Sequence, residues 1–358
     1  MAEKKILLVS IVGTKNFGNR LQQYALQRVI EDMGFRVDLL IKRPLRLMFS
    51  IRGTMKSWLR NPVRRASREK KDISTARRTN KFLKAKKLFY KNCVLVPEFF
   101  LQKKNWSAYE YAVVGSDQVW HGCSGLTYLA FMEPAKRISY APSFGFDQFP
   151  EEEIEAHRRG LNGMRALSCR EQSGCELIRE LTGREAQRVL DPTLLLTAAQ
   201  WEKIEKRPDF CVPNHYLLIN MLGTVLPAYE AEIKRLVGER SLQIVEISNV
   251  EDPEHYAVSP DEFLWLVHHA DTICTDSYHT AIFSILYEKN LRVFKRNQEN
   301  FNTMFGRLHD LLEPLELSEL VYGSGNGLST VLSEQAKAKL AADREASLAY
   351  LRKSLPIE

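Results

Sequence analysis

The sequence predicts an α/β protein with two Rossmann-like domains that face each other across a cleft, followed by a C-terminal helix. Apolar runs of strand length alternate with segments of helical periodicity in both halves of the chain. Several of these strands end in small, polar or charged residues, as they do where α/β proteins bind ligands. A chain of 358 residues is long enough for two such domains.

Composition places the chain among globular proteins and excludes several other classes. It contains 44% hydrophobic and 27% charged residues, which is typical of a soluble protein. The first apolar run stops at Gly13 and is too short for a membrane span or a signal peptide. The six cysteines are scattered without a CxxC pair or a Cys/His ligand spacing, so we expect reduced thiols, no metal and a cytoplasmic protein.

The chain opens with a strand, a turn, a helix and a second strand. The first strand covers residues 5–12, the helix ends at Gly34, and the next strand covers residues 35–41. This order favours a parallel sheet. The turn lacks both the GxGxxG pattern and a P-loop lysine. Asn16 and Asn19 either contact a phosphate or sugar, or merely belong to a cap of the helix.

A strongly basic segment, residues 42–91, interrupts this alternation. It contains 18 Lys and Arg and two acidic residues, a net charge of +16, so the rest of the chain carries −9. Because the basic character belongs to one segment, it does not indicate a nucleic-acid partner. Its apolar residues include Met48, Phe49, Ile51, Met55, Trp58 and Leu59. The mixture is typical of a helix on an anionic membrane surface, but a solvated insertion or a patch for an acidic partner remains open.

Four further strand ends carry polar residues in the first half of the chain. The strands are predicted over Tyr109–Val114, Arg137–Ala141, Ala166–Cys169 and Val189-Leu190. They run into Gly115-Ser116-Asp117, Pro142-Ser143, Arg170-Glu171 and Asp191-Pro192. Because the carboxyl ends of parallel strands meet at one edge of a sheet, these residues can form a site there. A helix is predicted over Gln172–Leu181.

The second half repeats the pattern. Strands are predicted over Tyr216–Met221, Gln243–Ile247, Thr272–Thr275 and Leu291–Phe294, and helices over Pro227–Gly238, Pro260–His269 and Thr330–Leu351. Two prolines between Thr197 and Asn214 indicate a hinge. We therefore expect an N-terminal domain over residues 1–196, a C-terminal domain over 197–328 and a terminal helix within 329–358.

His279 and Arg170 are the first candidates for function. His279 lies in the first turn of the helix after Thr272–Thr275, where backbone N–H groups and the helix dipole favour an anion. Its imidazole can titrate there, although a lone histidine in a helix is as often structural. Arg170 suits bidentate binding of a carboxylate or phosphate, or a salt bridge with Glu171. Asp276 either caps the helix or orients His279.

Other candidates surround these two. Asp117 can bind a sugar hydroxyl or act as a base, or it can cap the segment that follows. Asp191 is interpreted as a structural turn residue before its proline. Ser277 and Thr280 can donate to an anion at this edge. Arg296 and Arg307 can face the same cleft, although Arg307 can equally be a solvated helix residue.

In this order, the motifs resemble the polysaccharide pyruvyl transferase family. They are NFGNRLQQYALQRVIEDMGFRV, YAVVGSDQVW, RISYAPSFG, SCREQSG, VLDPTLLL and ADTICTDSYHTAIFSILYEKN. The resemblance runs from about Leu7 to Leu312, with residues 42–91 loosely covered. It implies a fold similar to GT-B glycosyltransferases. It also implies transfer of pyruvate from phosphoenolpyruvate to two hydroxyls of a sugar in a surface polysaccharide or its precursor, forming a cyclic ketal and releasing phosphate.

The resemblance also implies roles for individual residues. Arg170 matches an arginine that binds phosphoenolpyruvate, and His279 matches a proposed general acid. Ser277 stands where some members have a second arginine. The implied catalytic residues are His279 and Asp117. The donor-binding residues are Arg170, Ser277, Thr280, Arg296 and Arg307, and the acceptor-binding residues are Asn16, Asn19, Ser116 and Asp117. No cofactor or metal is expected, and the acceptor is a glycan, lipid-linked or free, at the inner face of the membrane.

Two other functions remain open. A GT-B-type glycosyltransferase would use the same cleft with a nucleotide sugar and release a nucleotide. A non-catalytic protein would dock on membranes or acidic polymers through residues 42–91. Deletion of that segment separates the second alternative from an enzyme, which would keep its activity on a soluble acceptor.

Overall fold

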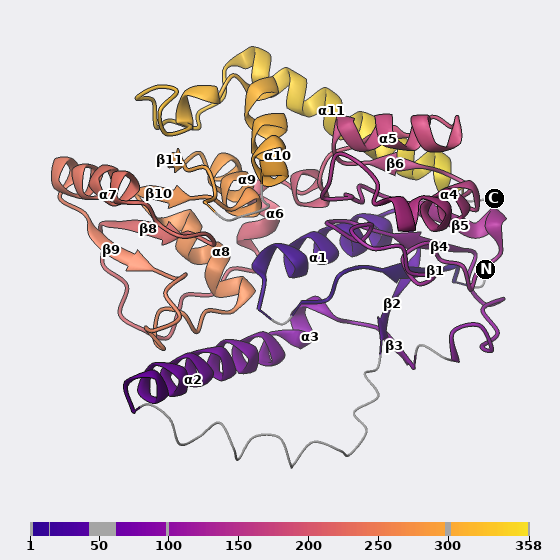
Figure 1. The fold of residues 1–358 in the computed structure, drawn as a ribbon, viewed down its shortest axis with the longest axis horizontal. Helices are drawn as coiled ribbons and strands as arrows, with labels where there is room; N and C mark the ends of the chain where they lie inside the picture. The colour runs from indigo at the N-terminus through magenta and orange to yellow at the C-terminus, as the bar shows by residue number, and fades with distance from the viewer. Residues whose placement is uncertain (1–2, 14, 43–61, 98–99, 298–301, 357–358) are drawn as a thin grey trace.

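Two parallel β-sheets, one in each half of the chain, form the framework of the protein. The computed structural model describes residues 3–13, 15–42, 62–97, 100–297 and 302–356. The first sheet has the order β3-β2-β1-β4-β5, and the second has the order β11-β10-β8-β9 (Figure 1). The first contains β1 (Lys5–Val9), β2 (Arg36–Lys42), β3 (Cys93–Val96), β4 (Tyr111–Val114) and β5 (Arg137–Ser139). The second contains β8 (Tyr216–Asn220), β9 (Gln243–Glu246), β10 (Thr272–Thr275) and β11 (Asn290–Val293).

Helices connect the strands, and a short third sheet lies in the first half. The third sheet pairs β6 (Ser168–Cys169) with β7 (Gln187–Arg188). The helices of the first half are α1 (Phe17–Asp32), α2 (Pro62–Lys84), α3 (Lys86–Phe89), α4 (Ile154–Asn162) and α5 (Gln172–Thr182). Those of the second are α6 (Ala198–Glu202), α7 (Pro227–Arg240), α8 (Pro260–His269), α9 (Tyr278–Leu286), α10 (Asn302–Leu312) and α11 (Glu334–Ser354).

The α/β fold with two Rossmann-like halves and a C-terminal helix is confirmed. Every strand pair in the two main sheets is parallel. Helix α8 and strand β10 have the predicted bounds. Helix α11 begins at Glu334 and not at Thr330, because Ser333 caps it by accepting the N–H of Ala336. The strand expected at Val189-Leu190 lies two residues earlier, in β7.

The two sheets share one hydrophobic core. Its buried members include Leu8 of the first sheet and Leu218 and Ile273 of the second. The ring of Phe17 in α1 stacks on that of Phe263 in α8, with centroids 4.5 Å apart. The start of α1 is therefore held against the second half of the molecule.

Helix α2, the described part of the basic segment, packs against the second half. The Arg78 guanidinium is buried and donates to the carbonyls of Ile247 (2.7 Å) and Tyr256 (2.8 Å). Lys81 pairs with the buried Glu262 at 2.7 Å. The apolar residues from Met48 to Leu59 lie outside the described residues, so contact of residues 42–91 with a membrane stays a prediction. Within the described part of the chain, no helix is long and apolar enough to span a bilayer.

Candidate active site

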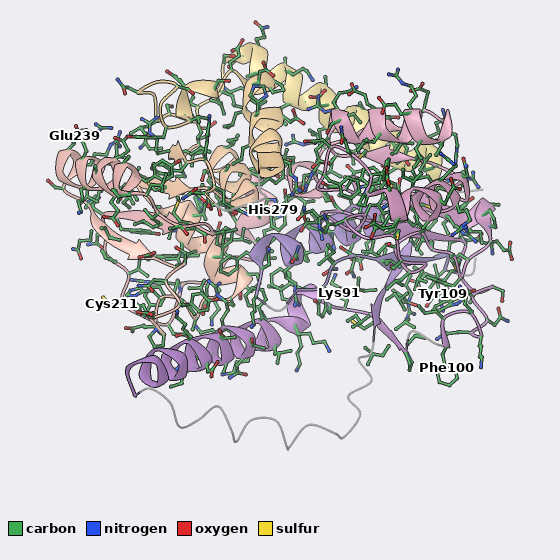
Figure 2. The ribbon with its side chains drawn as sticks, in the orientation of Figure 1. Lys91, Phe100, Tyr109, Cys211, Glu239 and His279 are labelled. Atoms are coloured by element: carbon green, nitrogen blue, oxygen red, sulfur yellow. The ribbon has the colours of Figure 1, made fainter. Side chains whose placement is uncertain are left out.

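His279 lies where the two halves meet. Ser277 caps α9 by accepting the N–H of Thr280, which places His279 in the first turn. Its side chain is 12% exposed, and Figure 2 shows it near the centre of the molecule. The imidazole lies directly against Gly18 in the first turn of α1, because a β-carbon added there would lie 2.1 Å from Nδ1. Two helix starts therefore converge on His279.

Asp191 joins His279 to Arg170. Its Oδ2 lies 3.5 Å from His279 Nε2 and 2.9 Å from Arg170 Nη1. Its Oδ1 accepts hydrogen bonds from the Thr193 N–H (3.0 Å) and hydroxyl (2.7 Å). Burial alone would raise the pKa of Asp191, but the charges of His279 and Arg170 and the Thr193 bond hold that pKa well below its usual range. Asp191 is therefore ionised at neutral pH.

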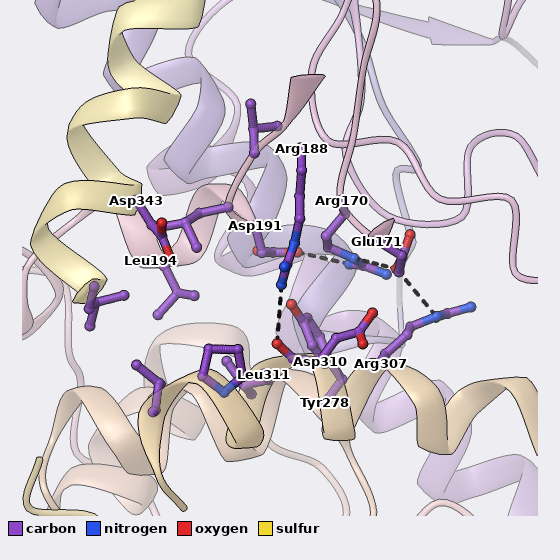
Figure 3. Close-up of a pocket in the computed structure, with 15 residues that line it drawn as sticks. Arg170, Glu171, Arg188, Asp191, Leu194, Tyr278, Arg307, Asp310, Leu311 and Asp343 are labelled. Atoms are coloured by element: carbon purple, nitrogen blue, oxygen red, sulfur yellow. Dashed lines mark hydrogen bonds and ion pairs between the residues drawn. The ribbon is translucent and has the colours of Figure 1, made fainter. Parts of the chain in front are cut away.

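A row of alternating charges continues from Arg170. Arg170 Nε donates to Glu171 Oε1 at 2.8 Å, and Arg307 Nε lies 3.5 Å from the same oxygen (Figure 3). The Arg170 guanidinium lies over the Tyr278 ring, 4.6 Å from its centroid. Burial and the charge of Arg170 lower the pKa of Arg307 from its ordinary value of 12.5, yet an arginine remains cationic under these conditions. The row thus runs from Arg307 to His279 through two carboxylates.

Two buried guanidinium nitrogens in this row, Nη2 of Arg170 and Nη2 of Arg307, have no hydrogen-bond partner among the described residues. Nε2 of His279 lies 3.5 Å from Asp191 Oδ2. Leaving a buried donor unpaired costs on the order of 1–3 kcal/mol, and more for a charged group. The two guanidinium nitrogens in one site suit a ligand that offers several anionic oxygens.

Two pockets adjoin the row. The first, of about 50 Å³, is lined by Arg170, Asp191, Tyr278 and Arg307 (Figure 3). The second pocket, of about 260 Å³, also has Arg307 in its lining. Both pockets are also lined by Glu171 and Asp310.

The predicted acceptor residues are only partly accessible. Asp117 has a positive φ of 65° and accepts a hydrogen bond from the Asn19 amide. Asn16 is exposed and caps α1 by accepting the Asn19 N–H at 3.2 Å, which is the structural role that the sequence left open. Ser116 is fully buried, and its hydroxyl donates to the Ala141 carbonyl at 2.6 Å.

The other predicted donor-binding residues are engaged within the protein. Thr280 is fully buried and accepts a bond from Asn220 at 2.7 Å. Arg296 pairs with Asp276 at 3.3 Å. Asp276 also accepts the N–H groups of Leu222 and Gly223, so it fixes the segment after β8. The expectation that Asp276 caps α9 or orients His279 is therefore wrong, since Ser277 is the cap and Asp191 is the carboxylate beside His279.

Sequence reasoning missed three contributors to the site. Asp191 was interpreted as a turn residue, and this turn does place it correctly, but its second carboxylate oxygen faces Arg170 and His279. The sequence assigns no binding or catalytic role to Tyr278 or Gly18. Tyr278 directly precedes His279, and Gly18 lies between the candidate residues Asn16 and Asn19. This closeness in sequence to candidate residues is the one feature that could have pointed to Tyr278 or Gly18.

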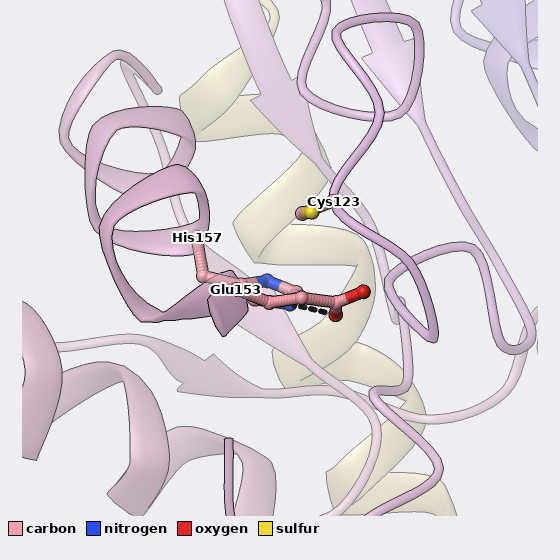
Figure 4. Close-up of side chains that lie close together, drawn as sticks. All are labelled: Cys123, Glu153 and His157. Carbon is pink, nitrogen blue, oxygen red and sulfur yellow. Dashed lines mark hydrogen bonds and ion pairs between the residues drawn. The ribbon is translucent and has the colours of Figure 1, made fainter. Parts of the chain in front are cut away.

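Among the described residues, two side-chain groups have atoms spaced closely enough to hold a metal ion, and neither includes a residue of the row. In Cys123, Glu153 and His157 (Figure 4), and in Glu205, His268 and His269, the potential ligand atoms lie within 4.8 Å of one another. Both ring nitrogens of His157 already have partners, the Tyr128 hydroxyl at 2.5 Å and Glu153 at 3.3 Å. The expected absence of a metal stays a prediction.

The fold and the site define a class of protein: an α/β molecule with a buried row of alternating charges between two parallel-sheet halves. The sequence gives the particular family. The family model described as polysaccharide pyruvyl transferase matches residues 16–297, which is most of the chain. The protein therefore belongs to the polysaccharide pyruvyl transferase family. No curated protein sequence matches the chain significantly.

Several solved structures resemble the chain over nearly its whole length. A putative UDP-N-acetylglucosamine 2-epimerase from Listeria monocytogenes has a TM-score of 0.47 and 10% identity, covering 97% of each chain. UDP-GlcNAc 2-epimerase from Methanocaldococcus jannaschii has a TM-score of 0.46 and 12% identity, covering 97% of this chain and 92% of its own. Anabaena HepE, in complex with UDP and glucose, has a TM-score of 0.46 and 9% identity, covering 99% and 100%.

Proposed function

We propose that the protein transfers pyruvate from phosphoenolpyruvate to two hydroxyls of a sugar in a surface polysaccharide or its precursor. The products are a cyclic ketal and phosphate. The observation that carries the proposal is the pair of buried guanidinium nitrogens, Nη2 of Arg170 and Nη2 of Arg307, that lack a partner among the described residues and lie in the same row as His279. Phosphoenolpyruvate supplies a phosphate and a carboxylate, which accept charge-assisted hydrogen bonds from such donors. Family membership supports the same conclusion.

His279 supplies a proton to the methylene carbon of phosphoenolpyruvate. Protonation converts this carbon to a methyl group and makes the neighbouring carbon electrophilic. The ionised Asp191, 3.5 Å from Nε2, orients the imidazole and stabilises the positive charge that it carries before transfer. Asp191 is thus a positioning residue, and His279 is the group that touches the reacting atoms.

The acceptor then reacts in two steps. A first sugar hydroxyl adds to the electrophilic carbon and loses its proton, which Asp117 accepts. The C–O bond to phosphate breaks and phosphate leaves. A second hydroxyl then adds to the same carbon, gives its proton to the imidazole of His279 that was left neutral by the first step, and closes the ring. Arg170 and Arg307 bind the anion and stabilise the charge that develops as phosphate leaves.

The deciding experiment incubates purified protein with phosphoenolpyruvate and a panel of bacterial glycans. The expected result is phosphate release that depends on one acceptor, together with a mass increase of the glycan corresponding to a pyruvyl ketal. His279→Ala should abolish phosphate release while circular dichroism stays unchanged. Near-normal turnover by this variant would refute the assigned acid. Release of a nucleotide from a nucleotide sugar, with no use of phosphoenolpyruvate, would instead identify a glycosyltransferase.

The place of the reaction in the cell is part of the proposal. Phosphoenolpyruvate is a metabolite of the cytoplasm, which is where we expect the protein to act. A lipid-linked acceptor and contact of residues 42–91 with the inner face of the membrane would bring enzyme and acceptor together. Flotation with anionic vesicles, with and without residues 43–61, tests that contact: binding that is unaffected by the deletion would argue against it.

A further inference from the structure

The second pocket has an aromatic wall. Phe144 and Phe146 line it, with ring centroids 5.5 Å apart. Both rings pack on the imidazole of His157, at 5.8 and 5.9 Å. The Tyr128 hydroxyl and Glu153 hold that imidazole in place (Figure 4 shows the latter pair). The wall is therefore supported from behind, and the half-buried Phe146 presents an apolar face to the pocket.

Other residues that line the pocket are polar. Arg307, 5% exposed, lines the pocket, and its Nη2 lacks a partner among the described residues. This nitrogen lies close to Gly145, where an added β-carbon would be 3.1 Å away. Asp310 and the exposed Gln172 and Ser173 at the start of α5 also line the pocket. The pocket thus combines the guanidinium of Arg307 with groups that accept hydrogen bonds.

The charges around the pocket decide between ligands. Glu171, Asp147 and Asp310 contribute three carboxylates, but Glu171 is already paired with Arg170 at 2.8 Å. The carboxylates of Asp147 and Asp310 remain beside the guanidinium of Arg307 and disfavour a second anion in this pocket. A hydroxyl group both donates and accepts, so it can bond to the carboxylates and to Arg307 at once. An aromatic face beside such groups also suits the apolar C–H face of a sugar ring.

We propose that this pocket binds a neutral pyranose ring of the acceptor glycan. Its volume of about 260 Å³ is sufficient for one ring. Arg307 and Glu171 line both pockets, so a ring here lies next to the row of charges. The N–H of Ser143, which lines the pocket, donates to the backbone carbonyl of Asp117 at 2.8 Å, so Asp117 is in direct contact with a lining residue. That the bound sugar is the acceptor of the reaction rests on the proposed function, whereas binding of a sugar in this pocket does not.

The test measures sugar binding without phosphoenolpyruvate. Saturation-transfer NMR and titration use the neutral methyl pyranosides of glucose, galactose and mannose, with a methyl hexuronide as the anionic counterpart. Wild-type protein should bind at least one neutral glycoside more tightly than the hexuronide. Phe146→Ala and Asp310→Asn should each weaken binding about tenfold, since each removes one contact to the ring. Phe100→Ala, at an exposed phenylalanine outside the pocket, is the matched control and should bind normally.

Three results would overturn the sugar pocket: no saturable binding of any glycoside, preference for the hexuronide, or equal binding by wild type and both pocket variants. Circular dichroism of each variant confirms that it is folded. The two proposals fail separately. If no sugar binds in this pocket but acceptor-dependent phosphate release persists, the acceptor binds elsewhere and the proposed function stands. If sugar binds but no phosphate is released, only the proposed pyruvyl transfer is refuted.

Discussion

Asp191 is the residue on which the two charged partners depend. It contacts Arg170 and His279 through one oxygen while the other oxygen holds the turn through Thr193. A substitution that keeps the shape of the side chain and removes its charge therefore separates the two roles. This separation is possible because Thr193 donates to the carboxylate, and an amide oxygen can accept the same bonds.

Asp191→Asn should leave the fold intact and lower kcat by at least about 100-fold, because the imidazolium and Arg170 lose their common counter-charge. The measurement is phosphate release as a function of pH, where a positioning role predicts a shifted profile as well as a lower rate. Thr193→Val is the control for the turn and should change stability more than it changes the pH profile. An unchanged profile in Asp191→Asn would assign the carboxylate a purely structural role.

The same carboxylate contributes to acid stability. A group whose pKa is lowered by folding stabilises the native state above its unfolded pKa, about 3.9 for Asp, and loses this contribution as the pH falls toward the folded pKa. Since the pKa of Asp191 is held well below its usual range, the free energy of unfolding should fall steeply below about pH 4. Urea unfolding across that range should show a shallower fall in Asp191→Asn.

Position 18 requires glycine because the His279 ring lies against it, and not because of its backbone conformation. Gly18→Ala places a β-carbon where the His279 ring now lies, so the ring must move. A displacement of this kind costs about 100-fold in turnover. Gly238→Ala in α7 is the matched control, because nothing lies within 4 Å of its added β-carbon, and it should keep full activity. Normal turnover in Gly18→Ala would show that the observed ring position is not the catalytic one.

At the scale of elements, α2 shows what periodicity detects and what it misses. Helix α8 and strand β10 were predicted with correct bounds because their apolar residues follow the spacing of a helix and a buried strand. Nearly half of the residues of helix α2 are charged, 11 of 23. It is attached through a buried guanidinium and the fully buried Phe82, and no local pattern of apolar residues reports a charged side chain that binds distant carbonyls.

Neighbouring arginines in α2 test this attachment. Arg78→Ala removes two hydrogen bonds to carbonyls and a stack on Tyr256, 3.7 Å from the ring centroid. The expected loss in the free energy of unfolding is about 2–4 kcal/mol. Arg77, the adjacent residue, is exposed, and Arg77→Ala should change stability by less than about 0.5 kcal/mol. Equal effects in urea unfolding would mean that α2 is not docked in solution.

At the scale of the whole molecule, the site exists only because the two halves meet. His279 comes from α9, the helix that follows β10 of the second sheet, whereas Arg170 and Asp191 come from the first half. The sequence placed Arg170 and His279 at the correct strand and helix ends. It could not show that Asp191 lies between them, because that depends on how the halves are oriented across a shared core.

This shared core predicts cooperative unfolding. The core cluster that contains Leu8 also contains Leu218 and Ile273, so neither half can open without exposing apolar surface of the other. Thermal unfolding followed by circular dichroism and by tryptophan fluorescence should therefore give coincident transitions. Two separated transitions would show that the halves are independent domains, as the boundary near residue 196 would allow.

The C-terminal helix determines the order in which the protein can be completed during synthesis. Tyr350 in α11 donates to the Ser139 carbonyl, and Ser347 accepts the N–H of Leu190, so the first half of the chain is covered by a helix that is synthesised after the second half. A nascent chain therefore carries an unfinished first half through most of translation. Until α11 leaves the ribosome, the polar edge of that half has no cover, and chaperone binding should concentrate in that interval.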